Sequence, residues 1–322
     1  MKIIHIGLGK SYSSTFKNIF YPYLCDKYSY LFNPEEFLKI MRENYIYSNE
    51  DKILLSEKLN NNNVLIASES LVNWVPSNWV KAADRNVDLF GSDANIIINL
   101  RDTHQYLTSL YLQMIHEGNI ISPNVFFCTP ELYKKYKPFL SEESLQRFDS
   151  SSLDYEFLVS IYKKRFKNVY VVNHDKVLTL YPWNVLFNMD NDDKEKILFL
   201  IRKAPRYNKS YSRISIKLTF ILEKIFSFIG FKSRGSQDIE FQTQSFIKIK
   251  KLNVNYISNF DIISKNLLRK IFKNWRWWMQ NFVNKVLTYK KYKLPNNVYI
   301  DNKILDKNRL FLEKINQKII DN

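Results

Sequence analysis

The residues best suited to chemistry stand together near the start of the chain. Residues 7–16 read Gly-Leu-Gly-Lys-Ser-Tyr-Ser-Ser-Thr-Phe, and they lie between a short apolar run and a helical pattern. A strand-to-helix turn of this kind presents backbone N–H groups and the positive end of the helix dipole, and Lys10 adds a full positive charge. The loop therefore predicts an anion site made by Lys10, Ser11, Ser13, Ser14 and Thr15. The alternative is that Ser14 or Thr15 only caps the helix.

A second pair of residues suited to an anion follows the apolar run 95–100. Arg101 comes directly after this run, and Ser109 comes eight residues later, about two helical turns on. A guanidinium group at a strand end can hold a phosphate through two parallel hydrogen bonds, and a serine on the next helix can close the other side. The alternative is that Arg101 pairs with Asp102 and that Ser109 faces a groove between helices.

The elements that must position these residues alternate between strands and helices. Short, nearly all-apolar runs predict strands at residues 2–6, 63–67, 95–100 and 168–172, and helical spacing of apolar residues predicts helices at 15–24, 106–115, 155–166 and 193–204. This alternation predicts an α/β fold in which a mostly parallel sheet is flanked by helices. Ligands bind beyond the carboxyl ends of such strands, where this sequence has residues 10–15, 68–70, 101–102 and 174–175.

From about residue 214 onward the pattern becomes helical. We expect one domain over residues 1–322, with 214–322 a mainly helical C-terminal extension packed on it. Residues 265–287 combine strong 3.6-residue periodicity with a basic face and three tryptophans. Two interpretations stay open for this helix: a core-packed helix with a solvated basic face, or a surface for acidic glycan or anionic lipid headgroups.

Composition limits the classes of function. The chain has 322 residues and a formal net charge of +16, which indicates an anionic partner without choosing one. Two cysteines cannot form a disulfide framework, and no Cys/His cluster suggests zinc. Neither a signal peptide nor a membrane-spanning run is evident, so we expect a cytoplasmic protein, with contact at the inner membrane face through helix 265–287 as an option. No signature of a nucleic-acid-binding module is evident, so none is expected as a partner.

The loop at residues 7–16 is not a nucleotide-binding Walker loop, because the first glycine of that motif would fall at Ile4. It resembles the 5′-phosphosulfate loop of sulfotransferases that use 3′-phosphoadenosine 5′-phosphosulfate (PAPS), whose pattern is close to G-x-P-K-[ST]-G-T-T-x-L. The family's 3′-phosphate element is a strand, then Arg-[DN]-Pro, then a serine eight residues after the arginine, often followed by x-Tyr. Arg101, Ser109 and Tyr111 have this spacing.

Weaker agreement with this family extends through the chain. Residues 206–212 resemble an N-x-S-x-S stretch that lies near the nucleotide in bacterial members, which would bring Asn208 and Ser210 to the cofactor. Residues 306–309 resemble their terminal Asp-Asn-Arg helix start. Carbohydrate sulfotransferases use a glutamate just after the second strand as general base, and Glu69 stands at that place; it could also be a surface or capping residue. His104 is the alternative base.

The resemblance implies a P-loop-like sulfotransferase fold, and a sulfuryl transfer from PAPS to a hydroxyl or amine that leaves PAP and needs no metal. The catalytic residues would be Lys10, Glu69 and His104. A carbohydrate or glycolipid is the implied acceptor. Tyr12 stands where the family has glycine, which keeps open a non-catalytic PAP- or anion-binding protein of the same fold; a nucleotide-phosphate kinase is a further alternative.

Overall fold

The computed structural model describes residues 1–8, 15–117, 120–136, 147–204, 211–228, 282–283 and 290–320. The chain forms two compact units. The first comprises residues 1–106, 150–208 and 300–322, and the second comprises residues 107–149 and 209–299. The last helix, α16 (Asn302–Ile320), thus belongs to the first unit. Whether the whole chain behaves as a single domain stays a prediction.

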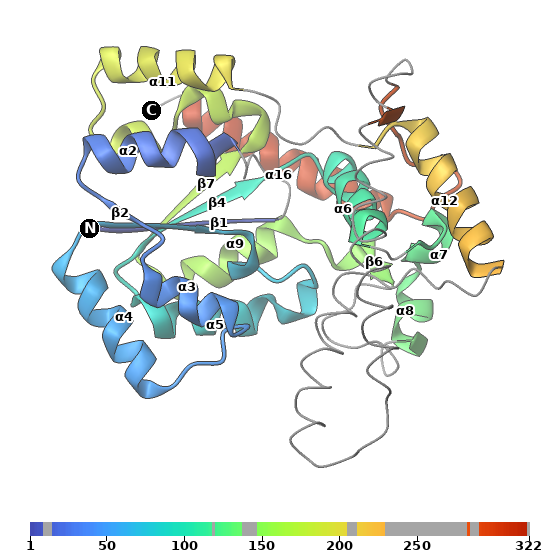
Figure 1. The fold of residues 1–322 in the computed structure, drawn as a ribbon, viewed down its shortest axis with the longest axis horizontal. Coiled ribbons are helices and arrows are strands. Elements are labelled where there is room, and N and C mark those ends of the chain that lie inside the picture. The colour runs from blue at the N-terminus through green and yellow to red at the C-terminus, as the bar shows by residue number, and fades with distance from the viewer. Residues whose placement is uncertain are drawn as a thin grey trace, which may run out of the picture. The chain divides into compact units, whose positions relative to one another are not determined.

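The first unit is built on a parallel five-stranded sheet (Figure 1). The strand order is β2-β3-β1-β4-β7, and every neighbouring pair is parallel. The strands are β1 (Lys2–Gly7), β2 (Leu31–Phe32), β3 (Val64–Ser68), β4 (Asn95–Leu100) and β7 (Asn168–Asn173). The predicted α/β fold with a parallel sheet between helices is therefore confirmed, and four of its strands lie where the apolar runs placed them.

Burial explains why these runs form strands. Every residue of β3 and β4 is buried, and so is all of β1 after Lys2. Ile4 of β1 pairs with Ile66 on one side and with Ile96 on the other, and all three side chains are fully buried. A strand that is covered on both faces does not alternate apolar and polar residues. The sequence accordingly has continuous apolar runs at these strands.

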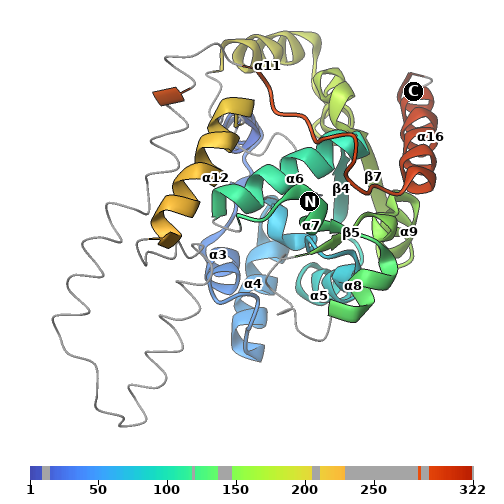
Figure 2. The same cartoon turned by 90° about the vertical axis from the view of Figure 1, so that its right-hand side faces the viewer.

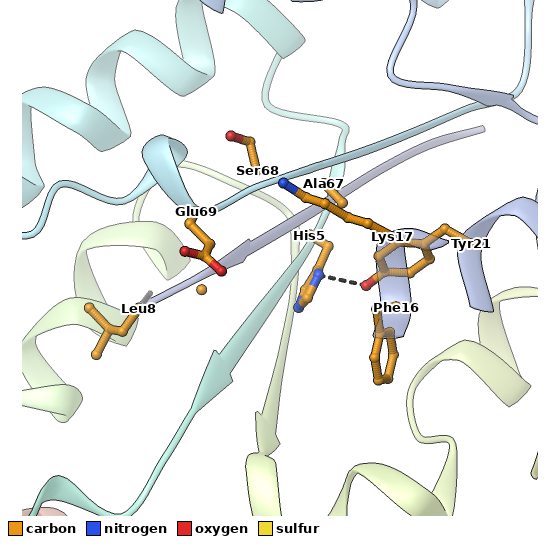
Figure 3. Close-up of a pocket in the computed structure, with 9 residues that line it drawn as sticks. His5, Leu8, Phe16, Lys17, Tyr21, Ala67, Ser68 and Glu69 are labelled. Atoms are coloured by element: carbon orange, nitrogen blue, oxygen red, sulfur yellow. Dashed lines mark hydrogen bonds between the residues drawn. The ribbon is translucent and has the colours of Figure 1, made fainter. Parts of the chain in front are cut away.

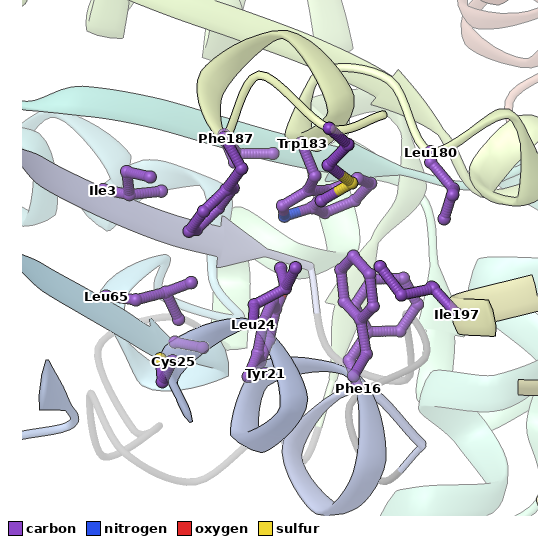
Figure 4. Packing of buried hydrophobic residues seen from close by; sticks show 14 of the residues in the cluster. Ile3, Phe16, Tyr21, Leu24, Cys25, Leu65, Leu180, Trp183, Phe187 and Ile197 are labelled. Carbon is purple, nitrogen blue, oxygen red and sulfur yellow. The ribbon is translucent and has the colours of Figure 1, made fainter. Parts of the chain in front are cut away.

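One face of the sheet is covered by an aromatic-rich layer (Figure 4). A π-helical turn, η1 (Phe16–Phe20), continues into α2 (Tyr21–Lys27), so the predicted helix at residues 15–24 is helical but starts with a wider turn. Phe16, Tyr21 and Trp183 pack together over the sheet, where the Phe16 and Trp183 ring centroids are 5.1 Å apart. The layer also includes η6 (His174–Thr179), α10 (Trp183–Leu186) and α11 (Asn191–Lys203).

The opposite face is covered by helices that alternate with the strands along the chain (Figure 1). They are α3 (Glu35–Arg42), α4 (Asn49–Asn61), α5 (Trp79–Phe90) and α9 (Tyr155–Lys163). Short 3₁₀ turns join them, at η2 (Glu69–Leu71), η3 (Pro76–Asn78) and η5 (Ser150–Ser152). Figure 2 shows α16 running beside β7 and α9, so the end of the chain closes the β7 edge.

The second unit contains most of α6 (Thr103–Glu117), which starts in the first unit. Tyr111 of α6 is fully buried within this unit. Its ring stacks on Tyr292 with centroids 6.0 Å apart, and its hydroxyl donates to the Ile121 carbonyl at 2.8 Å. The remaining described elements are α7 (Pro123–Phe126), β5 (Phe127–Cys128), α8 (Pro130–Tyr136), β6 (Phe148–Asp149) and α12 (Arg213–Phe228).

Of two predictions for the C-terminal part, one is confirmed and the other falls mostly outside the described residues. The helical pattern that begins near residue 214 is confirmed by α12. The predicted basic, tryptophan-rich helix at 265–287 lies outside the described residues except for 282–283. Among the described helices, none combines the length and the apolar character that crossing a membrane requires.

Candidate functional site at the carboxyl ends of the strands

The strand order brings the predicted site residues to one edge of the sheet. Because β1 lies between β3 and β4, the loop that leaves β1 emerges between the segments that follow β3 and β4. Glu69 comes directly after β3, Arg101 after β4, and His174 after β7. All strands are parallel, so these residues and Leu8 after β1 share the carboxyl edge, where open α/β sheets bind ligands.

Part of the predicted anion loop can be placed, and most of it lies outside the described chain. Thr15 is described: it is half-buried at the start of η1, its backbone is already helical, and its side chain makes no capping hydrogen bond. The interpretation of Thr15 as only a helix cap is therefore wrong. The predicted cofactor residues outside the described part are Lys10, Ser11, Ser13, Ser14, Asn208 and Ser210.

Glu69 occupies the first position after β3 and is half-buried. The neighbouring Ser68 caps the short turn η2, because its hydroxyl accepts from the Ser70 backbone N–H at 3.4 Å. Glu69 is thus not needed as a cap, and its carboxylate points toward the end of β1 (Figure 3). Whether the carboxylate also faces Lys10, as the general-base prediction requires, stays a prediction, because Lys10 lies outside the described residues.

Glu69 lines a pocket of about 290 Å³, a volume that includes its open mouth. The pocket lies between the ends of β1 and β3 and the first turn of the helix that begins at Phe16. Its apolar wall includes Leu8 and the Phe16 ring. Its polar side chains are His5, Lys17, Tyr21, Ser68 and Glu69.

His5 and Tyr21 form a buried pair at the floor of this pocket. The Tyr21 hydroxyl and His5 Nδ1 are 2.6 Å apart (Figure 3). Burial lowers the pKa of His5 to about 3, and the nearby positive charge of Lys17 acts in the same direction. Burial also raises the pKa of Tyr21 well above its ordinary value. Both groups are therefore neutral near pH 7.

Arg101 is held against the first turn of α6. Its Nε and Nη2 donate to the Gln105 side-chain oxygen at 3.3 and 3.1 Å. Asp102 has another role, since its carboxylate accepts from the Gln105 backbone N–H at 2.9 Å and so caps α6. The guanidinium thus stays at the sheet edge in a defined orientation, as a phosphate ligand requires.

Asn308 on α16 fixes the backbone around Arg101. Its side chain is fully buried and donates to the Thr103 hydroxyl at 3.1 Å and to the Leu153 carbonyl at 2.7 Å. Its oxygen accepts from the Tyr155 backbone N–H at 3.0 Å. The Tyr155 hydroxyl in turn donates to the Arg101 carbonyl at 2.8 Å. The last helix therefore supports the strand end that carries Arg101.

His174 adds a second, half-buried imidazole to the same edge. Burial lowers its pKa to about 3, and the positive charge of Arg101 acts in the same direction, so the two side chains are close in space. His104, the alternative base, is exposed on the first turn of α6. Ser109 is half-buried farther along α6 but belongs to the second unit, so its pairing with Arg101 stays a prediction.

Three contributions to this edge were not predicted from the sequence. The sequence gives no signal for Lys17, because one lysine in a helical pattern resembles any solvated lysine. A histidine within an apolar run is typical of a structural residue, although His5 also lines the pocket. The resemblance includes Asn308 only as part of the family-like helix start at residues 306–309. A polar residue at an otherwise apolar position of the last helix was the signal that could have indicated its buried role.

No family model matches this chain, and no curated protein and no solved structure matches it either. Among the described residues there is also no group of three or more His, Cys, Asp or Glu side chains arranged to hold a metal ion. The function of this edge of the sheet must therefore be argued from its own residues.

Proposed function

We propose that the protein is a PAPS-dependent sulfotransferase that transfers a sulfuryl group to a hydroxyl or amine of a carbohydrate or glycolipid acceptor. The observation that carries this proposal is the strand order β3-β1-β4. It puts Glu69 after the strand on one side of β1 and Arg101 after the strand on the other side. The residues that we propose as general base and as phosphate ligand thus follow the two neighbours of the strand that precedes the loop resembling the family's 5′-phosphosulfate loop.

The residues of this edge fit a nucleotide with two phosphate groups. Neighbouring strands are roughly 5 Å apart, so a ligand held at the ends of β1 and β4 needs anionic groups separated by a short bridge such as one ribose. Arg101 would bind the 3′ phosphate, with Ser109 as its predicted partner. Lys10, Ser11, Ser13, Ser14 and Thr15 would surround the 5′ phosphosulfate. Asn208 and Ser210 would lie near the nucleotide.

PAPS supplies an activated sulfuryl group, and the chain's own residues would position it and manage charge and proton. Glu69 takes the proton of the acceptor hydroxyl or amine as the new bond to sulfur forms. The bond between sulfur and the bridging oxygen breaks, and its electron pair leaves with PAP. Lys10 would stabilise the charge that develops on that oxygen. Such transfer depends mainly on positioning and on electrostatic stabilisation.

Thermal unfolding of the full chain tests the proposal against its alternatives. A ligand that binds only the native state stabilises it by about 2.7 kcal/mol at 100 times its dissociation constant, which is roughly 5–10 °C for a unit of this size. We expect PAP to raise the melting temperature and ATP–Mg²⁺ not to raise it. Stabilisation by ATP–Mg²⁺ alone would favour a nucleotide-phosphate kinase. Stabilisation by PAP without any turnover of PAPS would favour the non-catalytic alternative that Tyr12 suggests.

A further inference from the structure

Helix α12 of the second unit turns apolar side chains outward and hydroxyl groups inward (Figure 2). Its buried positions are Ser215, Ile216 and Thr219, each at most 4% exposed. On the other side of the helix, Ile221 is 53% exposed and Ile225 is 50% exposed. A helix that meets only water on its outer face buries isoleucine and exposes serine and threonine. The reversed arrangement in α12 indicates that its outer face contacts an apolar environment.

Hydrogen bonds fix the orientation of α12 at its start. The Ser212 hydroxyl accepts from the Ser215 backbone N–H at 3.1 Å and so caps the helix. The Arg213 backbone N–H donates to the Lys290 carbonyl at 3.0 Å. One turn further on, the buried Thr219 hydroxyl donates to the Ser215 carbonyl at 2.8 Å. The outward isoleucines therefore belong to a helix that is anchored through its hydroxyl-bearing side.

A stripe of cations runs along the exposed face of α12. Arg213, Lys217 and Lys224 are all exposed, and their spacing of four and seven residues puts them on one line along the helix. The helix contains one acidic residue, Glu223, which is half-buried. The outer face is thus positively charged along this line.

A stripe of isoleucines lies next to the cations. Ile214, Ile221 and Ile225 are separated by seven and four residues, so they form a second line along the same exposed face. A helix with an apolar stripe bordered by lysine and arginine is suited to lying in the plane of a membrane surface.

Charge favours a lipid surface over a second copy of the chain as the occupant of this face. In a symmetric dimer, the same face of both copies would meet, which would bring the two cation stripes together and cause repulsion. Anionic headgroups would instead pair with the cations, while the isoleucines enter the boundary between headgroups and acyl chains. The net charge of +16 acts in the same direction.

We propose that α12 is a peripheral membrane helix that docks the protein on a surface of anionic lipids. The isoleucine stripe of α12 enters the apolar boundary, and its cation stripe stays at the level of the lipid phosphates. The proposal uses no residue of the proposed catalytic site, so it stands or falls independently of the sulfotransferase assignment.

Co-sedimentation of the full chain with vesicles tests the proposal. Vesicles of phosphatidylcholine alone are compared with vesicles in which one lipid in three is phosphatidylglycerol. Each cation near an anionic membrane contributes about fivefold to the affinity, so we expect the anionic vesicles to bind at least about 10-fold more tightly. Equal binding to the two kinds of vesicle, or binding to neither, would overturn the proposal.

Lysine variants test whether the attraction comes from α12. Lys217→Gln combined with Lys224→Gln should weaken binding to the anionic vesicles by about 10-fold or more. The control combines Lys81→Gln on α5 with Lys163→Gln on α9, which removes two exposed lysines from the first unit and should change binding by less than about threefold. Equal losses in the two double variants would mean that net charge alone attracts the vesicles, and the assignment to α12 would be wrong.

Isoleucine variants test whether the apolar stripe meets lipid or another part of the chain. Ile221→Gln combined with Ile225→Gln should weaken vesicle binding by about 10-fold and leave the melting temperature within about 2 °C of the wild type. The control, Ile53→Gln with Leu54→Gln, changes two exposed apolar residues of α4 and should keep vesicle binding. A large loss of melting temperature in the α12 variant would show that the stripe packs within the protein, and would overturn the proposal.

Discussion

At the scale of single residues, the carboxyl edge of the sheet contains two different kinds of polar group. Arg101 and Asn308 are engaged in hydrogen bonds that fix their orientation. Glu69 and Lys17, in contrast, line a pocket without forming an ion pair with each other. Fixed groups suit the binding of a rigid nucleotide.

The general-base assignment predicts the behaviour of Glu69→Gln. Glutamine keeps the shape of the side chain but cannot take a proton. Since a positioned base contributes about 10²–10⁴ in rate, kcat for PAP formation from PAPS should fall by that order, while the affinity for PAP stays near that of the wild type. His104→Gln is the matched comparison, because His104 is the alternative base. If His104→Gln lost the activity and Glu69→Gln kept it, the two roles would be exchanged.

His5 predicts a pH dependence of stability. Its pKa is about 3 in the folded chain and 6.5 in an ordinary environment, so between these values the unfolded chain binds a proton that the folded chain does not. The free energy of unfolding should therefore fall as the pH drops from about 6.5, by up to about 1.4 kcal/mol per pH unit from this one group.

Urea unfolding of wild type and His5→Asn at pH 7, 6 and 5 measures this contribution. The difference between the two proteins removes the effect of the carboxylates, which both share. Wild type should lose stability faster than His5→Asn as the pH falls. Parallel losses in the two proteins would contradict a neutral, buried His5.

At the scale of elements, the last helix and the strand that ends at Arg101 form one structural assembly. Asn308 connects α16 to Thr103 at the start of α6 and to Leu153 and Tyr155 before and within α9. Asn316 on the same helix accepts from Asn173 at the end of β7 at 3.1 Å. Helix α16 thus holds the ends of two neighbouring strands from outside the sheet.

This assembly predicts the effect of Asn308→Ala. Removing the amide leaves buried partners without hydrogen bonds, which costs about 1–3 kcal/mol for each group left unsatisfied. We expect urea unfolding to show a loss of about 2–4 kcal/mol, and PAP affinity to weaken as well because Arg101 loses its support. The control is Asn302→Ala, at an exposed position of the same helix. Equal losses of stability and of PAP affinity in the two variants would contradict this structural role of Asn308.

The sequence predicted the elements whose burial is complete on both sides. Strands β1, β3 and β4 were predictable because their residues are almost all apolar and buried. Helix α4 was missed, because it buries Leu55 and Leu59 but leaves Ile53 more than half exposed, which hides the amphipathic pattern. Its start was readable, since Ser48 and Asp51 have the spacing of a capping box and form one.

The candidate site was predictable where it follows a strand and was missed where it depends on packing. Glu69 and Arg101 could be placed at one edge because parallel strands end together. The pocket was not predictable, because His5 and Lys17 meet Glu69 only after η1 folds over β1. A lone histidine within an apolar strand resembles a core residue, and only the geometry shows that its second nitrogen has no partner among the described residues.

At the scale of the whole molecule, the residues proposed as general base and 3′-phosphate ligand both belong to the first unit. A net charge of +16 suits a protein whose proposed donor, PAPS, is anionic. The predicted contact of residues 265–287 with anionic glycan or lipid headgroups stays a prediction. Its residues lie outside the described chain, apart from 282–283.

The most direct test of the central claim compares two nucleotides on two proteins by calorimetry. PAP has a 3′ phosphate and adenosine 5′-phosphosulfate has none, so only PAP can contact Arg101 through that group. Arg101→Ala should weaken PAP by about 10- to 100-fold, the effect of losing charged hydrogen bonds, and change adenosine 5′-phosphosulfate by less than about twofold. Equal losses for the two ligands, or wild-type protein that binds neither, would contradict the assignment of this sheet edge to PAPS.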